Sequence, residues 1–308
     1  MTGLAVVVED VHVAYGTTWA LDGVDLEVSR GSTLGVLGHN GAGKTTLIRV
    51  LTTLVRPNAG RVVVDGFDVG ADAEQVRLRI GITGQYAGLD EFLTGRENLE
   101  FVGRLIGLGR RARARAGELI DRLGLDELAG RRVGELSGGS RRRIDLAASL
   151  VGSPSVLFLD EPTTGLDPTA RLALWDVVDE LTASGTTVVL TTQYLEEADR
   201  LADDIVVLDH GRIAAKGTPV ELKRLIGGKV VTVTVPAAQA DRLPRTPDRR
   251  RPAGPEHVTV TYNVSHAEDA GTVVAHLGQV GITICELDVT SPSLDDVFTY
   301  LTPIGART

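Results

Sequence analysis

The chain has 308 residues, a formal net charge of −9 and 43% hydrophobic residues, which predicts one large domain plus a smaller one and a sizeable core. The acidic balance argues against a nucleic-acid-binding protein, because phosphate backbones attract a positive surface. With one cysteine, no run of roughly 18 apolar residues and no apolar leader after Met1, the sequence favours a soluble or peripheral protein of a reducing compartment.

The first fifty residues begin with alternating apolar and polar positions. This alternation predicts β-strands within residues 4–30, with turns at Gly16 and Gly23. Residues 33–37 read Thr-Leu-Gly-Val-Leu, which is typical of a short buried strand, and residues 46–51 have the pattern of a helix. A strand followed closely by a helix therefore frames the glycine-rich segment between them.

That segment, residues 38–45, reads Gly-His-Asn-Gly-Ala-Gly-Lys-Thr and matches the complete phosphate-loop pattern GxxxxGKS/T. Its glycines let the backbone turn tightly and aim N–H groups at phosphate oxygens. Lys44 stands where it reaches the β- and γ-phosphates, and the Thr45 hydroxyl is placed to hold Mg²⁺. A glycine-rich turn with a chance lysine would not explain the flanking strand and helix. The residues predicted to bind ATP here are Gly38, His39, Asn40, Gly41, Ala42, Gly43, Lys44, Thr45 and Thr46.

Further along, apolar strands alternate with helical segments, which predicts a mostly parallel sheet covered on both faces. The stretch from Thr94 to about Arg132 has helical spacing, and its arginines at 110–115 fit a solvated helix face. A second basic run stands at 141–143. The predicted strands are 61–66, 156–159, 186–192 and 205–208, and the clearest predicted helix is 170–183.

Two carboxylates follow directly after the apolar strand at 156–159. Parallel sheets bind ligands at the carboxyl ends of their strands, so both side chains are expected at the site. Asp160 suits the Mg²⁺ shell, and Glu161 suits a base that polarises the attacking water. The alternative is an acidic helix cap before Pro162, and the upstream phosphate loop argues against it.

A third motif, Leu-Ser-Gly-Gly-Ser at 136–140, stands about twenty residues before Asp160. Ser137 and the two glycines after it can present a hydroxyl and backbone N–H groups to a γ-phosphate. Alone, such a pentapeptide is usually a simple turn, and only its position relative to the other motifs favours a functional interpretation.

The composition changes after Gly228. Residues 236–255 are rich in proline and arginine, which predicts an exposed, mobile loop. The other segments of this region are predicted as strands at 229–235, 257–264 and 282–289, and as helices at 267–277 and 294–301. We therefore expect two domains, residues 1–226 and a small accessory or regulatory α+β domain at residues 229–308.

The phosphate loop, the segment 136–140 and the Asp160-Glu161 pair follow one another along the chain as the motifs of the ATP-binding cassette (ABC) family do. The sequence closely resembles this family over residues 3 to about 226. The resemblance implies an α/β fold, a P-loop NTPase core with antiparallel β and helical subdomains, and here an added α+β domain. It also implies that Tyr15 stacks on adenine, that Gln85 contacts ATP and Mg²⁺, and that Gln193 lies beside the γ-phosphate. The predicted catalytic residues are then Glu161, Gln193 and Lys44, and the predicted Mg²⁺ ligands are Thr45, Gln85 and Asp160.

Three stretches, 85–90, 191–199 and 293–298, are similar to daunorubicin-resistance-type drug-export ATPases. This similarity implies an ATP hydrolase that powers drug or antibiotic efflux through a separate membrane permease, from the cytoplasmic face of the membrane. No nucleic-acid partner is expected, because the net charge of −9 argues against one.

The family resemblance also implies two interfaces. In the ATP-bound homodimer, the signature residues of one protomer would face the phosphate loop of the other; they are Ser137, Gly138 and Gly139. The permease would dock on the region from Gln85 to Leu108, where Leu89, Phe92 and Leu93 either meet it or pack into the core.

Two residues depart from the family pattern, Ser140 in place of a glutamine and Gln193 in place of a histidine. An amide donates hydrogen bonds but does not become cationic near neutral pH, so we expect altered activity rather than a dead site. Three alternatives stay open: a soluble ABC-type ATPase of translation or repair, an importer ATPase subunit, and a nucleotide-binding module without hydrolysis. The single cassette disfavours the first, the export-type stretches disfavour the second, and Glu161 disfavours the third.

Overall fold

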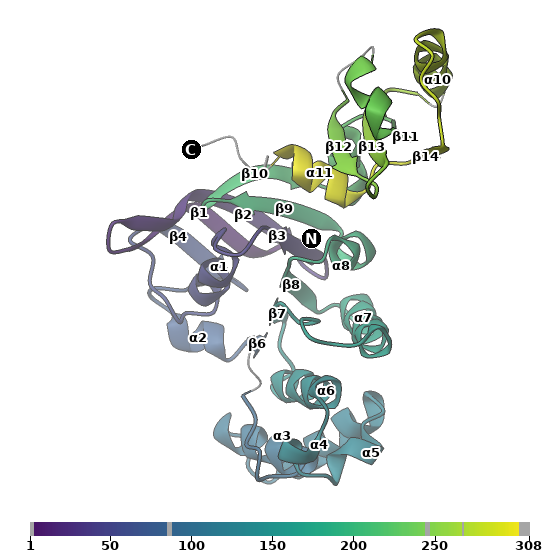
Figure 1. The fold of residues 1–308 in the computed structure, drawn as a ribbon. Coiled ribbons are helices and arrows are strands. Elements are labelled where there is room, and N and C mark those ends of the chain that lie inside the picture. Colours follow the sequence, from purple (N-terminus) through teal and green to yellow (C-terminus); the bar gives the residue numbers. More distant parts are fainter. Residues whose placement is uncertain (1–2, 85–87, 244–246, 267, 302–308) are drawn as a thin grey trace. The chain divides into compact units, whose positions relative to one another are not determined.

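The computed structural model describes residues 3–84, 88–243, 247–266 and 268–301. The chain divides into two compact units, Met1–Thr218 and Pro219–Thr308, shown in Figure 1. Each unit has its own sheet or sheets and its own core, so each is described by itself. No helix among the described residues has both the length and the apolar character that crossing a bilayer requires.

An antiparallel sheet of order β2-β1-β4-β5 begins the larger unit. Its strands are β1 (Leu4–Tyr15), β2 (Thr18–Ser29), β4 (Ala59–Val64) and β5 (Phe67–Asp68). The predicted turn at Gly16 is present, but the predicted turn at Gly23 is wrong, because β2 runs through this residue. Gly23 has φ of 72° and Asp10 on the neighbouring strand has φ of 47°, where the pairing of β1 with β2 shifts register. Glycine here accommodates a bulge instead of a chain reversal.

The central sheet has six strands in the order β10-β9-β3-β8-β7-β6, with β10 antiparallel to β9 and the remaining pairs parallel. The strands are β3 (Thr33–Leu37), β6 (Ile80–Thr83), β7 (Val156–Asp160), β8 (Thr187–Thr192), β9 (Asp204–Asp209) and β10 (Arg212–Gly217). All residues of β3, β7 and β8 are buried, as expected for strands covered on both faces. The alternating strands and helices therefore form the predicted α/β core.

Helices cover this sheet on two sides and create two separate hydrophobic cores. They are α1 (Lys44–Leu51), α2 (Ala73–Arg77), α6 (Gly138–Ser149), α7 (Pro168–Ala183) and α8 (Leu195–Leu201). Because side chains alternate along a strand, β7 contributes to both cores: Phe158 packs in the core that contains α1, and Leu157 packs in the core that contains α6 and α7.

A helical layer lies beyond α6 in Figure 1 and consists of α3 (Gly95–Leu105), α4 (Arg111–Arg122) and α5 (Asp126–Ala129). Helix α3 begins with a capping box, in which Thr94 and Glu97 each accept a hydrogen bond from the backbone N–H of the other. Leu99 of α3 and Ile120 of α4 are fully buried in the same core as α6. The fold is therefore the predicted P-loop core with antiparallel β and helical subdomains.

The smaller unit contains a four-stranded antiparallel sheet of order β12-β13-β11-β14. Its elements are α9 (Pro219–Arg224), β11 (Lys229–Pro236), a 3₁₀ helix (Ala237–Arg242), β12 (Arg249–Pro252), β13 (His257–Val264), α10 (Asp269–Gln279), β14 (Glu286–Thr290) and α11 (Leu294–Leu301). The prediction of one long loop over residues 236–255 is wrong, because the 3₁₀ helix and β12 lie there. The sequence does not indicate a strand at β12, because this short edge strand consists of three arginines and a proline and has no alternation of apolar residues.

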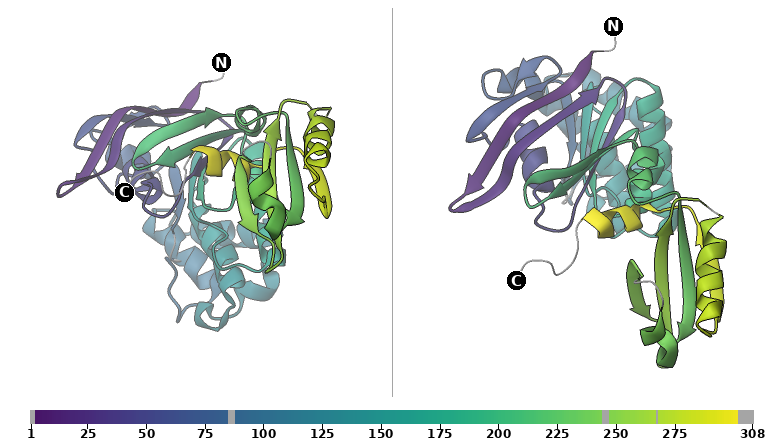
Figure 2. Two further views of the ribbon diagram at one scale, coloured as in Figure 1. Left: turned by 45° about the horizontal axis from the view of Figure 1, so that its top comes forward. Right: turned by 90° about the horizontal axis from the view of Figure 1, so that it is seen from above.

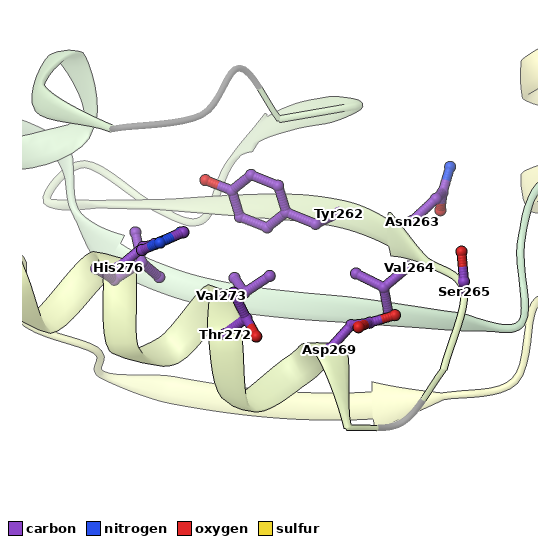
Figure 3. A pocket seen from close by; sticks show the side chains of 9 residues that line it. Tyr262, Asn263, Val264, Ser265, Asp269, Thr272, Val273 and His276 are labelled. Atoms are coloured by element: carbon purple, nitrogen blue, oxygen red, sulfur yellow. The ribbon is translucent and has the colours of Figure 1, made fainter.

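Helix α10 lies against one face of the small sheet (Figure 2). Val273 and Leu277 of this helix share a buried core with Tyr262 of β13. Between β13 and α10 lies a pocket of about 280 Å³, which Tyr262, Thr272 and His276 help to line (Figure 3). The edge strands differ in charge, since β12 is basic whereas β14 carries Glu286 and Asp288 and is exposed along its whole length.

Candidate nucleotide-binding site

The phosphate loop connects the buried carboxyl end of β3 to the first turn of α1. Gly43 has φ of 111°, and a Cβ atom on it would lie 2.5 Å from the carbonyl oxygen of Ala20. A Cβ atom on Gly38 would lie 2.5 Å from the carbonyl oxygen of Leu208. Glycine is therefore required at Gly38 by space and at Gly43 by both space and backbone conformation.

Helix α1 starts at Lys44 with no side-chain cap and no acidic residue in its first turn. Its first backbone N–H groups and the positive end of its dipole are thus available to an anion. The Lys44 side chain is only 4% exposed. Its Nζ donates to the carbonyl oxygens of Gly38 at 2.8 Å and His39 at 3.2 Å, so the ammonium group is held at the mouth of the loop.

The two predicted carboxylates meet this loop from β7. Asp160 is buried, and its Oδ1 accepts hydrogen bonds from the hydroxyls of Thr191 at 2.5 Å and Thr45 at 3.4 Å. Glu161 Oε1 lies 3.5 Å from Lys44 Nζ. The structure therefore brings Lys44, Thr45, Asp160 and Glu161 into one cluster, with oxygen donors of the kind that Mg²⁺ prefers at Thr45 and Asp160.

Glu161 has φ of 48°, a left-handed conformation that costs a residue with a side chain on the order of 1 kcal/mol or more. Its backbone N–H donates to both the carbonyl and the hydroxyl oxygen of Thr191, each at 3.1 Å. These bonds to β8 hold the turn against its strain. The turn directs the Glu161 carboxylate back toward Lys44.

One buried arginine near this turn was not predicted. Arg142 on α6 is 8% exposed, and its guanidinium donates to the carbonyl oxygens of Pro162, Asp160 and Gly84. Its Nη1 lies 3.6 Å from Oδ2 of Asp145. Burial raises the pKa of the Asp145 carboxyl to about 6, although Arg142 and the backbone N–H of Gly88 oppose this shift. In the sequence Arg142 is one of three consecutive arginines, a pattern that indicates solvent rather than burial.

The signature motif forms the exposed N-terminus of α6. Ser137 is the N-cap residue, and its Oγ accepts a hydrogen bond from the backbone N–H of Ser140 at 3.2 Å. The two serine hydroxyls also lie 3.0 Å apart, so Ser140, the residue that departs from the family pattern, fixes the orientation of Ser137. Space around Gly138 is open. These groups are thus accessible to a ligand or to a second protomer.

The remaining predicted residues have different surroundings. Gln193 is exposed two residues after Thr191, which pairs with Asp160 across β7 and β8, so it lies at the same sheet edge as the carboxylates. Tyr15 is half exposed at the end of β1. Gln85 lies outside the described residues.

The loop residue His39 belongs to a second cluster, with Asp209 and His210. Its two ring nitrogens lie 2.7 Å from the carbonyl oxygen of Asn40 and 3.0 Å from Asp209 Oδ1. Both nitrogens are thus engaged with oxygen atoms, and the contacts attach the phosphate loop to the end of β9. We assign no metal to this cluster.

A P-loop fold with an acidic pair beside the loop lysine defines a nucleotide hydrolase. Known proteins agree: residues 21–164 match the ABC transporter family. The chain is 51% identical to daunorubicin resistance ATP-binding protein DrrA3 of Streptomyces coeruleorubidus, over 98% of this chain and 97% of that protein. It is 36% identical to Nod factor export ATP-binding protein I of Rhizobium sp. (strain N33), over 98% of each.

Among solved structures, an ATP-binding cassette in a dimeric post-hydrolysis state with ADP and Pi matches with a TM-score of 0.63 and 26% identity, over 69% of this chain and 98% of that one. The chain therefore belongs to the ABC transporter family. It is an ATP-binding, ATP-hydrolysing subunit similar to the daunorubicin-resistance group.

Proposed function

We propose that this chain powers the export of a drug-like or antibiotic compound through a separate membrane permease. One observation carries the proposal: relatives named for daunorubicin or doxorubicin resistance are 42–51% identical over at least 94% of this chain. The similarity thus includes the smaller unit as well as the cassette. A relative named for Nod factor export supports the same direction of transport.

The proposed chemistry assigns each clustered side chain a role. Lys44 and the N-terminus of α1 neutralise the β- and γ-phosphates of ATP, and Glu161 accepts a hydrogen bond from the attacking water and polarises it. Thr45 and Asp160 would hold Mg²⁺, which when bound neutralises charge on the phosphates. Gln193 would donate a hydrogen bond to the γ-phosphate. Tyr15, half exposed, would stack on adenine.

We further propose a homodimer in the ATP-bound state. The accessible Ser137 hydroxyl and the N-terminus of the 12-residue helix α6 would meet the γ-phosphate held by the partner's phosphate loop. A solved relative is dimeric, which supports this arrangement. The smaller unit would serve assembly or regulation, because the nucleotide motifs all precede it.

The permease would dock on exposed apolar side chains near the start and along one side of α3. Phe92 is 85% exposed, and Phe101, Leu105 and Ile106 are exposed as well. Leu89, in contrast, is partly buried against the core and is better explained by packing. A large exposed apolar group on a helical layer favours a partner surface, which would hold the chain at the cytoplasmic face of the membrane.

The test is reconstitution of the full chain in liposomes with a permease encoded beside it. Export predicts that daunorubicin raises ATP hydrolysis and that vesicles whose cytoplasmic face is outward accumulate the drug when given ATP. Glu161→Gln serves as the control for hydrolysis. Transport in the opposite direction would favour an importer. A rate of ATP hydrolysis that no permease changes would favour a soluble ATPase.

A further inference from the structure

One side chain of the signature helix α6 fixes the backbone on both sides of Glu161. Arg142 Nε donates to the carbonyl oxygen of Pro162 at 2.9 Å, and Nη2 donates to that of Asp160 at 3.3 Å. These residues immediately follow and precede Glu161. Because the guanidinium group is planar with its donors in a fixed fork, the two carbonyl groups are held in one geometry.

The same side chain and its acidic partner also bind the backbone of Gly84 and Gly88. Arg142 Nη1 donates to the carbonyl oxygen of Gly84, which directly follows β6. Asp145 Oδ1 accepts a hydrogen bond from the backbone N–H of Gly88 at 3.1 Å. Both described residues that flank positions 85–87 are therefore attached to α6.

The next arginine along the chain provides a comparison. Arg143 donates to the carbonyl oxygens of Leu123 at 3.0 Å and Gly124 at 3.1 Å, within the helical layer. It is thus an arginine on the same helix that also binds backbone carbonyls, but in a segment with no nucleotide motif. A purely structural role would be shared by Arg142 and Arg143.

Stability alone does not explain the buried ion pair of Arg142 and Asp145. Removing two charges from water costs more than their attraction commonly returns, and apolar residues of similar volume are often as stable. The raised pKa of Asp145 agrees, because burial disfavours the charged carboxylate by more than the nearby Arg142 favours it. A role in geometry accounts for the pair better than a role in stability.

We infer that Arg142, oriented by Asp145, is a positioning residue that links the signature helix to the turn carrying Glu161 and to both flanks of positions 85–87. A displacement of α6 would then be transmitted to the Glu161 turn. This inference rests on the proposed role of Glu161 as the base. It predicts an effect on turnover rather than on ATP affinity, because the described contacts of Arg142 lie outside the phosphate loop.

The experiment compares full-length variants Arg142→Gln, Arg142→Lys and the double variant Arg142→Leu/Asp145→Leu, with Arg143→Gln as the matched control. The double variant removes both charges together and so leaves no unpaired buried ion. We expect Arg142→Gln and the double variant to lower kcat about a hundredfold, the usual effect of a misplaced catalytic group. The Kd for ATP should change less than about twofold, and lysine should restore part of kcat.

A second measurement tests whether Arg142 holds the backbone at Gly88 and Glu161 in place. Amide hydrogen exchange at Gly88 and Glu161 should accelerate in the Arg142 variants and stay native in Arg143→Gln. Native kcat and native exchange in a folded double variant would overturn the inference, as would equal losses of kcat in Arg143→Gln. If Glu161→Gln hydrolyses ATP at the native rate, the proposed base is wrong, while exchange at these two amides still decides whether Arg142 positions them.

Discussion

Replacing Asp145 by asparagine should change the pH dependence of stability in the larger unit. Burial raises the pKa of this carboxyl from an ordinary value of 3.8 to about 6. The folded protein therefore binds the proton more tightly than the unfolded chain does. The stability linked to the protonated form is complete below about pH 3.8 and is lost as the pH rises through about 6.

The difference of about two pK units corresponds to about 3 kcal/mol in total, of which about 2 kcal/mol falls between about pH 4.5 and pH 8. Asparagine keeps a neutral side chain of the same shape at every pH. The free energy of unfolding of Asp145→Asn minus that of the native protein should therefore rise by about 2 kcal/mol over this interval.

Urea unfolding followed by tryptophan fluorescence measures this difference in one unit only, because Trp19 and Trp175 both lie in Met1–Thr218. Asp121→Asn, at an exposed position on α4, is the matched control, because the same substitution there removes no buried carboxyl group. A difference for Asp145→Asn that stays constant with pH, or that falls as the pH rises, would refute the reasoning.

Substitutions at three positions and one truncation test the site. Glu161→Gln should bind MgATP and accumulate the dimer on size exclusion with little phosphate release; native release would remove Glu161 from the role of base. Lys44→Ala should weaken ATP binding or turnover by about 1.5–3 kcal/mol, measured by nucleotide titration and steady-state hydrolysis. Gln193→Ala should slow hydrolysis more than it weakens binding, and Gln193→His should keep or raise activity and gain a pH dependence near neutrality; native turnover by the alanine variant would contradict this. A chain that ends at Thr218 should still bind ATP, and loss of binding by the folded fragment would disprove the independence of the larger unit.

The fold class could be predicted because buried parallel strands and the phosphate loop leave strong local patterns. Residues 156–160 are apolar without interruption up to Asp160, and the structure has a fully buried strand there. Short edge strands leave no such pattern. Arg212–Gly217 alternates exposed and partly buried residues, and β12 is mostly exposed, so neither was predicted.

The cluster of Lys44, Thr45, Asp160 and Glu161 was predictable because each residue stands at a fixed spacing from a strand end. The left-handed turn at Glu161 and the burial of Arg142 were not, because both depend on partners far away in the sequence. Thr191, which supports both carboxylate residues, begins the export-type stretch 191–199, but that resemblance gave it no role beside the carboxylates. Tertiary contacts thus supply the geometry that local sequence omits.

The opposite charges on the two edges of the small sheet have a consequence for solubility. Two copies cannot easily pair edge to edge through β14, because Glu286 and Asp288 of one copy would face the same carboxylates of the other. Pairing through β12 is opposed in the same way, because the arginines of the two copies would repel one another. Unlike edges attract instead, and such head-to-tail pairing produces rings or open chains rather than twofold-symmetric pairs. Turbidity of concentrated protein should therefore appear at low ionic strength and disappear on adding salt, which makes ionic strength the first variable to control during purification.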